Sequence, residues 1–225
     1  MNTNRLRMTI ATLAGVVVLA TAVEPVAALA ADSTNPANAS TAQAVAVSQL
    51  TAQEAADLAF MREEEKLARD VYQKLYETWD LPIFQNIAKS EQTHTNAVKT
   101  LLDRYQVADP TTGKAPGEFS DQALQDLYNQ LVADGRQSLA SALRVGAAIE
   151  EIDILDLQER IGHTTKVDIQ RVYQNLLNGS CNHLRSFVST LKTQTGETYQ
   201  PQYLTPEAYN SIVGAASGQG GRRGR

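Results

Sequence analysis

The sequence predicts an all-α protein, an antiparallel four-helix bundle with one additional short helix. Long segments with almost no Gly or Pro carry apolar residues at helical spacing. Short segments rich in turn-forming residues separate them, and short connections make neighbouring helices antiparallel. No segment shows the alternation of apolar and polar residues that is typical of a half-buried strand.

The first thirty residues resemble a secretory signal. Arg5 and Arg7 precede an apolar run over residues 8–22, and the small-x-small pattern that signal peptidase recognises ends at Ala30. The apolar run is short for a membrane span. We therefore expect cleavage near Ala30 and export, to a periplasm or to the outside. An uncleaved membrane anchor is the alternative.

The rest of the chain divides by composition. Residues 31–50 are rich in Ala, Ser, Thr and Asn, which predicts a disordered linker. Residues 51–193 contain the helical pattern and form the expected bundle domain. Residues 194–225 are a C-terminal tail with one short helix expected from Pro206.

Composition limits the classes of function. Hydrophobic residues make up 43% of the chain, which is enough for a core, and the net charge is −5 with acids and bases mixed throughout. We therefore expect no nucleic-acid partner. Cys181 is the single cysteine, so no internal disulfide can form, and we interpret it as a small buried helix residue.

Five helices are expected in the bundle domain, with boundaries set by caps and breakers. Thr51 or Ser48 can cap the first helix, the residue before Pro82 is pushed out of the helical region, and Ser120 is the expected cap of the short helix. Gly179 lies inside the last helix at a cost of about 1 kcal/mol relative to Ala. The expected helices cover residues 52–78, 84–105, 121–133, 137–161 and 167–192.

The second helix carries Glu91-x-x-His94. Residues three apart lie on one face of a helix, so this carboxylate and this imidazole can grip one metal ion. Counted from the turn at Asp80, Glu65 lies fifteen residues before it and His94 fourteen after it, which places them at one level of neighbouring helices. The alternative is a surface pair of charged residues.

The third and fourth helices add further candidates. Counted from the turn at Thr164, Glu150 lies fourteen residues before it and His183 nineteen after it, and Glu150 fits better than Asp153 or Asp156. Inward-pointing carboxylates would be costly without partners, because burial disfavours the charged form. Two divalent ions bridged by carboxylates would resolve that cost.

At this point the sequence resembles a known superfamily. IAKSEQTHTNAV, residues 87–98, resembles the second-helix motif of rubrerythrins and the ferritin-like superfamily. Glu65-x-x-Ala-x-x-x-Tyr72 is similar to the first-helix motif, and His183-Leu-Arg-Ser-Phe resembles the end of the fourth. IEEIDILDL and GSCNHLRSF resemble a narrower set of exported or archaeal ferritin-like domains of unknown function. The resemblance covers about residues 51–192.

The resemblance implies a ferritin-like fold with a dinuclear iron centre, Mn or Zn being alternatives. The implied reaction partners are metal ions with O₂ or peroxide, and the implied enzyme class, left open, is an oxidoreductase of the oxidase or peroxidase type. Tyr72 would line the metal pocket as a hydrogen-bond donor or redox-active phenol, with core packing as the alternative. The implied metal ligands are Glu65, Glu91, His94, Glu150, Asp153 and His183.

The chain departs from that superfamily in two ways. Ser180 stands where the fourth-helix motif has Glu, so one carboxylate is missing, and Asp153 is the candidate substitute. Without a second cysteine there is no Cys-x-x-Cys pair, so a rubredoxin-type electron-transfer module is not expected.

Several neighbouring polar residues have a structural interpretation. Asp153 can pair with Arg144 or Arg160 instead of a metal, His183 can be a hydrogen-bonded core residue, and His163 is expected to stabilise a turn. Three acidic residues are expected to face solvent, namely Glu63, Glu64 and Glu151.

Two functions therefore stay open. The first is an exported di-iron or Fe/Mn carboxylate protein that oxidises Fe²⁺ or scavenges peroxide. The second, favoured by Ser180, is a non-enzymatic metal- or partner-binding bundle with a degraded site. A storage cage is a weaker third hypothesis, and a homodimer is an open alternative for the quaternary structure.

Overall fold

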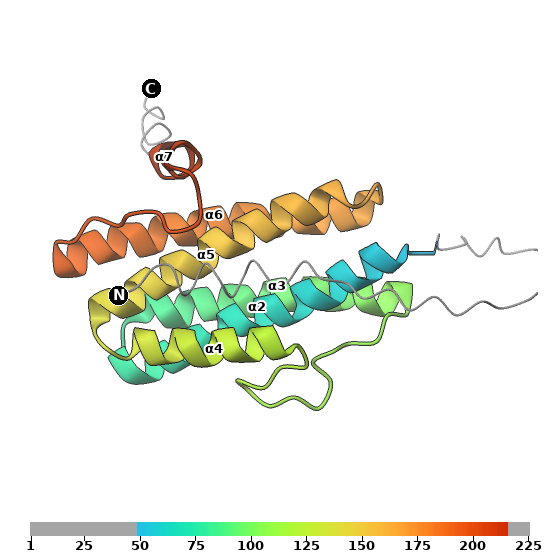
Figure 1. The fold of residues 1–225 in the computed structure, drawn as a ribbon, viewed down its shortest axis with the longest axis horizontal. Coiled ribbons are helices and arrows are strands. Elements are labelled where there is room, and N and C mark those ends of the chain that lie inside the picture. The colour runs from blue at the N-terminus through green and yellow to red at the C-terminus, as the bar shows by residue number, and fades with distance from the viewer. Residues whose placement is uncertain (1–48, 216–225) are drawn as a thin grey trace, which may run out of the picture. The chain divides into compact units, whose positions relative to one another are not determined.

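The computed structural model describes residues 49–215, and every regular element within them is a helix, so the predicted all-α fold is confirmed. The long helices are α2 (Ala52–Trp79), α3 (Pro82–Tyr105), α5 (Leu139–Gly162) and α6 (Val167–Thr195). The short ones are α4 (Gln122–Gly135) and α7 (Pro206–Gly214) (Figure 1).

The two ends of the chain are not described. The predicted signal segment, residues 1–30, and the linker up to residue 48 lie outside the described residues, as do residues 216–225 of the tail. Between residues 49 and 215, no helix is both long and apolar enough to cross a membrane.

Local capping fixes where the helices begin. The Thr51 hydroxyl accepts the Glu54 N–H at 3.1 Å and the Glu54 carboxylate accepts the Thr51 N–H at 2.8 Å, so a capping box starts α2. α3 begins with Pro82 at its first turn, where a missing N–H costs nothing. The prediction that Ser120 caps the short helix is wrong. Asp121 caps α4 by accepting two backbone N–H groups, and the Ser120 hydroxyl donates to a loop carbonyl instead.

The long helices pack as two antiparallel pairs, α2 with α3 and α5 with α6, and α4 lies against both α2 and α5 (Figure 1). An apolar cluster at one level joins all four long helices. It consists of Leu58, Met61, Val98, Leu101, Leu102, Leu157, Ile169, Tyr173 and Leu176. Polar groups that point inward at the neighbouring level are therefore removed from water.

Helix α2 is buried on most of its circumference, so the predicted exposure of Glu63 and Glu64 is wrong. These side chains are only 4% and 6% exposed. The Glu63 carboxylate accepts the backbone N–H of Ser120 and, at 3.1 Å, that of Asp121. Lys66 donates to two carbonyl groups of the same loop at 2.9 and 3.0 Å. The loop before α4 therefore covers the face of α2 that periodicity assigned to solvent.

Glu151 on α5 is fully buried, so its predicted surface position is also wrong. At 100° per residue it does point away from the bundle, but the segment after α6 folds back over it. Its carboxylate accepts the backbone N–H groups of Gln202, Tyr203 and Leu204 at 3.0, 2.6 and 2.8 Å. Glu151 therefore fastens the C-terminal segment to α5.

Candidate metal centre

Five of the predicted ligands meet in the middle of the bundle. Each is at most 9% exposed, and the four long helices all contribute. α2 supplies Glu65, α3 supplies Glu91 and His94, α5 supplies Glu150 and α6 supplies His183. Carboxylates and imidazoles at this depth need a charge partner or a metal ion.

The five side chains form two groups of three that share Glu91. In the first group, His94 Nδ1 lies 2.8 Å from Glu91 Oε2 and 3.2 Å from Glu65 Oε2. In the second, His183 Nδ1 lies 2.8 Å from Glu91 Oε1 and 3.5 Å from Glu150 Oε2. The donor atoms of each group lie within 4.8 Å of one another. Glu91 thus presents one carboxylate oxygen to each group.

Several of these atoms converge without bonding to one another. Glu91 Oε1 and His183 Nδ1 are 2.8 Å apart, yet neither has a hydrogen-bond partner, so the short distance is not accompanied by hydrogen-bond geometry. Glu65 Oε1 is buried without a partner as well. Buried polar atoms left unpaired are rare. The donor set and its orphaned atoms therefore fit a metal ion in each group.

Attraction between carboxylates and protonated imidazoles stabilises this cluster. Burial opposes ionisation of Glu91, but close contacts with the imidazoles of His183 and His94 outweigh it and lower the pKa of Glu91 to about 2. Burial opposes protonation of the two imidazoles as well. Contacts with Glu65 and Glu91 nevertheless raise the pKa of His94 to about 11, and contacts with Glu150 and Glu91 raise that of His183 to about 10. At neutral pH both imidazoles therefore carry protons that a metal ion must displace.

A second layer of contacts orients the ligands. His183 Nε2 lies 3.0 Å from Ser90 Oγ, so its Nδ1 is left facing the carboxylates. Such a partner fixes the tautomer and ring orientation of a ligating histidine. The fully buried Tyr72 hydroxyl donates to Glu150 Oε1 at 2.5 Å. Ser90 was not found by sequence reasoning, because its role depends on a residue ninety-three positions away.

The position of Gly179 inside α6 is explained by its closeness to the His94 ring. A Cβ added to Gly179 would lie 2.7 Å from both Cε1 and Nε2 of the His94 ring. The glycine inside α6 therefore makes room for a candidate ligand on α3. The sequence alone indicates that this glycine lowers helix propensity, but not that it leaves space for the His94 ring.

Asp153 belongs to neither group of three. It accepts a hydrogen bond from the Ser180 hydroxyl, which also lies 3.0 Å from the Leu176 carbonyl oxygen. Arg144 and Arg160, its predicted alternative partners, bond to other carboxylates.

Two other predicted residues lie away from the cluster. His163 Nδ1 lies 2.9 Å from Asp57 Oδ2, in the turn region where a structural role was predicted. Cys181 is half-buried rather than buried.

We expect Gly179→Ala to weaken metal binding without unfolding the protein. Ala is the better helix former by about 1 kcal/mol, but its Cβ would displace the His94 ring. A loss of about tenfold to a hundredfold in Zn²⁺ affinity is expected, with helix content by circular dichroism unchanged. Gly162→Ala is the matched control, because a Cβ there meets nothing within 4 Å. Equal affinity in both variants would remove His94 from the centre.

Metal binding should release protons. Because the pKa values of His94 and His183 are raised to about 11 and 10, both imidazoles are protonated at pH 7, and we expect about two protons released per chain when Zn²⁺ fills the centre. Affinity should therefore rise with pH. Calorimetry in buffers of different ionisation enthalpy measures the release, with His163→Asn as control. Zn²⁺ binding without proton release would show that the imidazoles are not ligands.

Comparison with known proteins shows which family this chain belongs to. Residues 54–216 match the family described as "Uncharacterized protein domain (DUF2202)". Uncharacterized protein MJ0754 of Methanocaldococcus jannaschii is 49% identical over 163 residues, which cover 72% of this chain and 88% of that protein. The crystal structure of hypothetical protein MJ0754 from Methanococcus jannaschii DSM 2661 matches with a TM-score of 0.71 at 45% identity, covering 81% of this chain and 98% of that one. The chain therefore belongs to the DUF2202 family.

Proposed function

We propose that this protein is a dinuclear metal protein of the ferritin-like, di-iron carboxylate type, with Fe or Mn as its metal. Its reaction would be the oxidation of Fe²⁺ or the removal of peroxide. The observation that carries the proposal is the shared carboxylate of Glu91, whose two oxygens each lie 2.8 Å from the Nδ1 of a different histidine.

The donor set supports this choice of metals. Each position would have one imidazole nitrogen and carboxylate oxygens, a mixture that suits Fe and Mn and also accepts Zn or Cu. A pair of Fe²⁺ or Mn²⁺ ions, if bound there, would supply one electron each, which are the two electrons that reduce O₂ to peroxide or peroxide to water.

The protein residues would hold and orient this centre. Glu91 would join the two positions, Ser90 would keep His183 turned toward the carboxylates, and Tyr72 would hold Glu150 through its hydroxyl. Ser180 has no carboxylate, and Asp153, which accepts its hydrogen bond, belongs to neither group, so the centre would have one carboxylate fewer than the rubrerythrin pattern. Fewer protein ligands leave coordination positions for water or substrate.

The same serine favours a second function. A centre that lacks one carboxylate can bind metal without turning over, which would make the protein a metal-binding or partner-binding bundle. For either function we propose export, on the basis of the signal-like residues 1–30.

The first test is metal content with a matched pair of variants. We expect the protein loaded with Fe²⁺ without oxygen to hold about two ions per chain, and Glu91→Ala to lose both, because both groups share that carboxylate. Glu159→Gln, which removes an exposed carboxylate on α5, should retain both.

The two functions then separate on exposure to O₂ or peroxide. Fast oxidation of the bound Fe²⁺ in the wild type, absent from Glu91→Ala, supports the enzyme. Stable binding without accelerated oxidation supports the non-enzymatic bundle. Iron content that is equal in the wild type and Glu91→Ala contradicts the dinuclear centre.

A further inference from the structure

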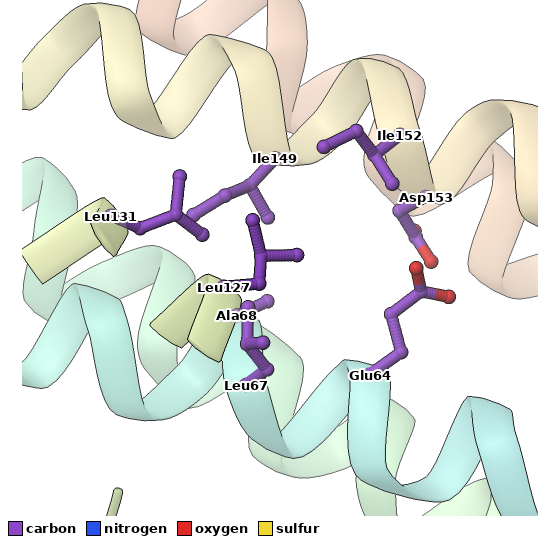
Figure 2. A pocket seen from close by; sticks show the side chains of 8 residues that line it. All are labelled: Glu64, Leu67, Ala68, Leu127, Leu131, Ile149, Ile152 and Asp153. Atoms are coloured by element: carbon purple, nitrogen blue, oxygen red, sulfur yellow. The ribbon is translucent and has the colours of Figure 1, made fainter. Parts of the chain in front are cut away.

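A second acidic feature lies beside the metal centre. Glu64 on α2 and Asp153 on α5 face each other across a small pocket (Figure 2), and each is 6% exposed. One oxygen of each, Glu64 Oε2 and Asp153 Oδ1, is buried without a hydrogen-bond partner. The side chains that line the rest of the pocket are apolar and cannot donate a hydrogen bond: Leu67, Ala68, Leu127, Leu131, Ile149 and Ile152.

The negative charge in this region exceeds the nearby positive charge. Arg160 bonds to Asp156 at 2.8 Å, and its Nε, which has no hydrogen-bond partner, lies 3.7 Å from Asp57 Oδ1, so its single charge faces more than one carboxylate. Two facing carboxylates with unpartnered oxygens therefore require either a proton or a cation between them.

We propose that Glu64 and Asp153 hold a third cation, a divalent ion bound through oxygen atoms alone, next to the dinuclear centre. Carboxylate oxygens suit hard ions such as Mn²⁺, Fe²⁺ or Mg²⁺. The unpartnered oxygens are the donor atoms, since the Ser180 hydrogen bond goes to the other Asp153 oxygen. Figure 2 shows the carboxylates of Glu64 and Asp153 pointing toward each other.

The proposed third cation site lies beside the dinuclear centre on both α2 and α5. Glu64 directly precedes Glu65 on α2, and Asp153 lies one turn after Glu150 on α5. An ion held by two carboxylates and no imidazole binds more weakly than an ion in either group of three, so it exchanges faster than they do. We assign it as the position from which metal ions load the centre, and this role, unlike the site itself, rests on the proposed function.

The test is the number of Mn²⁺ ions bound by the full chain at saturation, measured by equilibrium dialysis. We expect about three per chain for the wild type and for Glu159→Gln, and about two for Glu64→Gln, which keeps the side-chain shape and removes its charge. Asp153→Asn should also bind about two, and circular dichroism verifies the fold of each variant. The site is refuted if Glu64→Gln binds as many Mn²⁺ ions as the wild type, since a proton then neutralises the pair.

Glu91→Ala separates this proposal from the proposed function. Loss of about two Mn²⁺ ions in Glu91→Ala and of one in Glu64→Gln supports both proposals. Loss of one ion in Glu64→Gln with none lost in Glu91→Ala leaves the third position standing and removes the dinuclear centre. For the loading role, Glu64→Gln should fill the two remaining positions with Fe²⁺ at least about tenfold more slowly in stopped-flow mixing. Loading at the wild-type rate would overturn that role.

Discussion

The interaction on which the structure depends is the contact of one buried carboxylate, Glu91, with two imidazoles. Its oxygens lie 2.8 Å from His94 Nδ1 and 2.8 Å from His183 Nδ1. A carboxylate that is 2% exposed would destabilise the fold if it were unpaired, because removing a charge from water costs several kcal/mol. Protonated imidazoles compensate it in the metal-free protein, and metal ions would compensate it in the loaded one. In both states, α3 and α6 must hold Glu91 and His183 at the same height along the bundle.

The bundle supports this arrangement with buried charges on two other sides. The outer face of α2 binds the loop before α4 through Glu63 and Lys66, while its inner face sends Glu65 to the centre and Glu64 toward α5. Glu151 likewise binds the C-terminal segment, next in sequence to the inward-pointing Glu150. Adjacent carboxylates therefore serve different partners because a helix turns 100° per residue. The loop before α4 and the C-terminal segment therefore cover the outer faces of α2 and α5.

Sequence reasoning placed Glu65 beside Glu91 and His94 by counting residues from one turn, since antiparallel helices with short connections keep equal distances from the turn. The all-α fold followed from periodicity. Periodicity failed for Glu63 and Glu151, because it assigns solvent to every face that is not apolar and cannot see a loop folding over that face. It failed for Glu64 because that carboxylate points toward α5, where it faces Asp153. The roles of Ser90 and Gly179 were also out of reach, since each depends on an imidazole from another helix.

An anomalous difference map of crystals grown with Fe²⁺ or Mn²⁺ would locate the metal ions relative to Glu91 most directly. We expect two peaks, one on each side of the Glu91 carboxylate and about 3.5–4 Å apart, the first contacting His94 and the second His183. A single peak, or peaks that contact neither histidine, would contradict a dinuclear centre shared through Glu91.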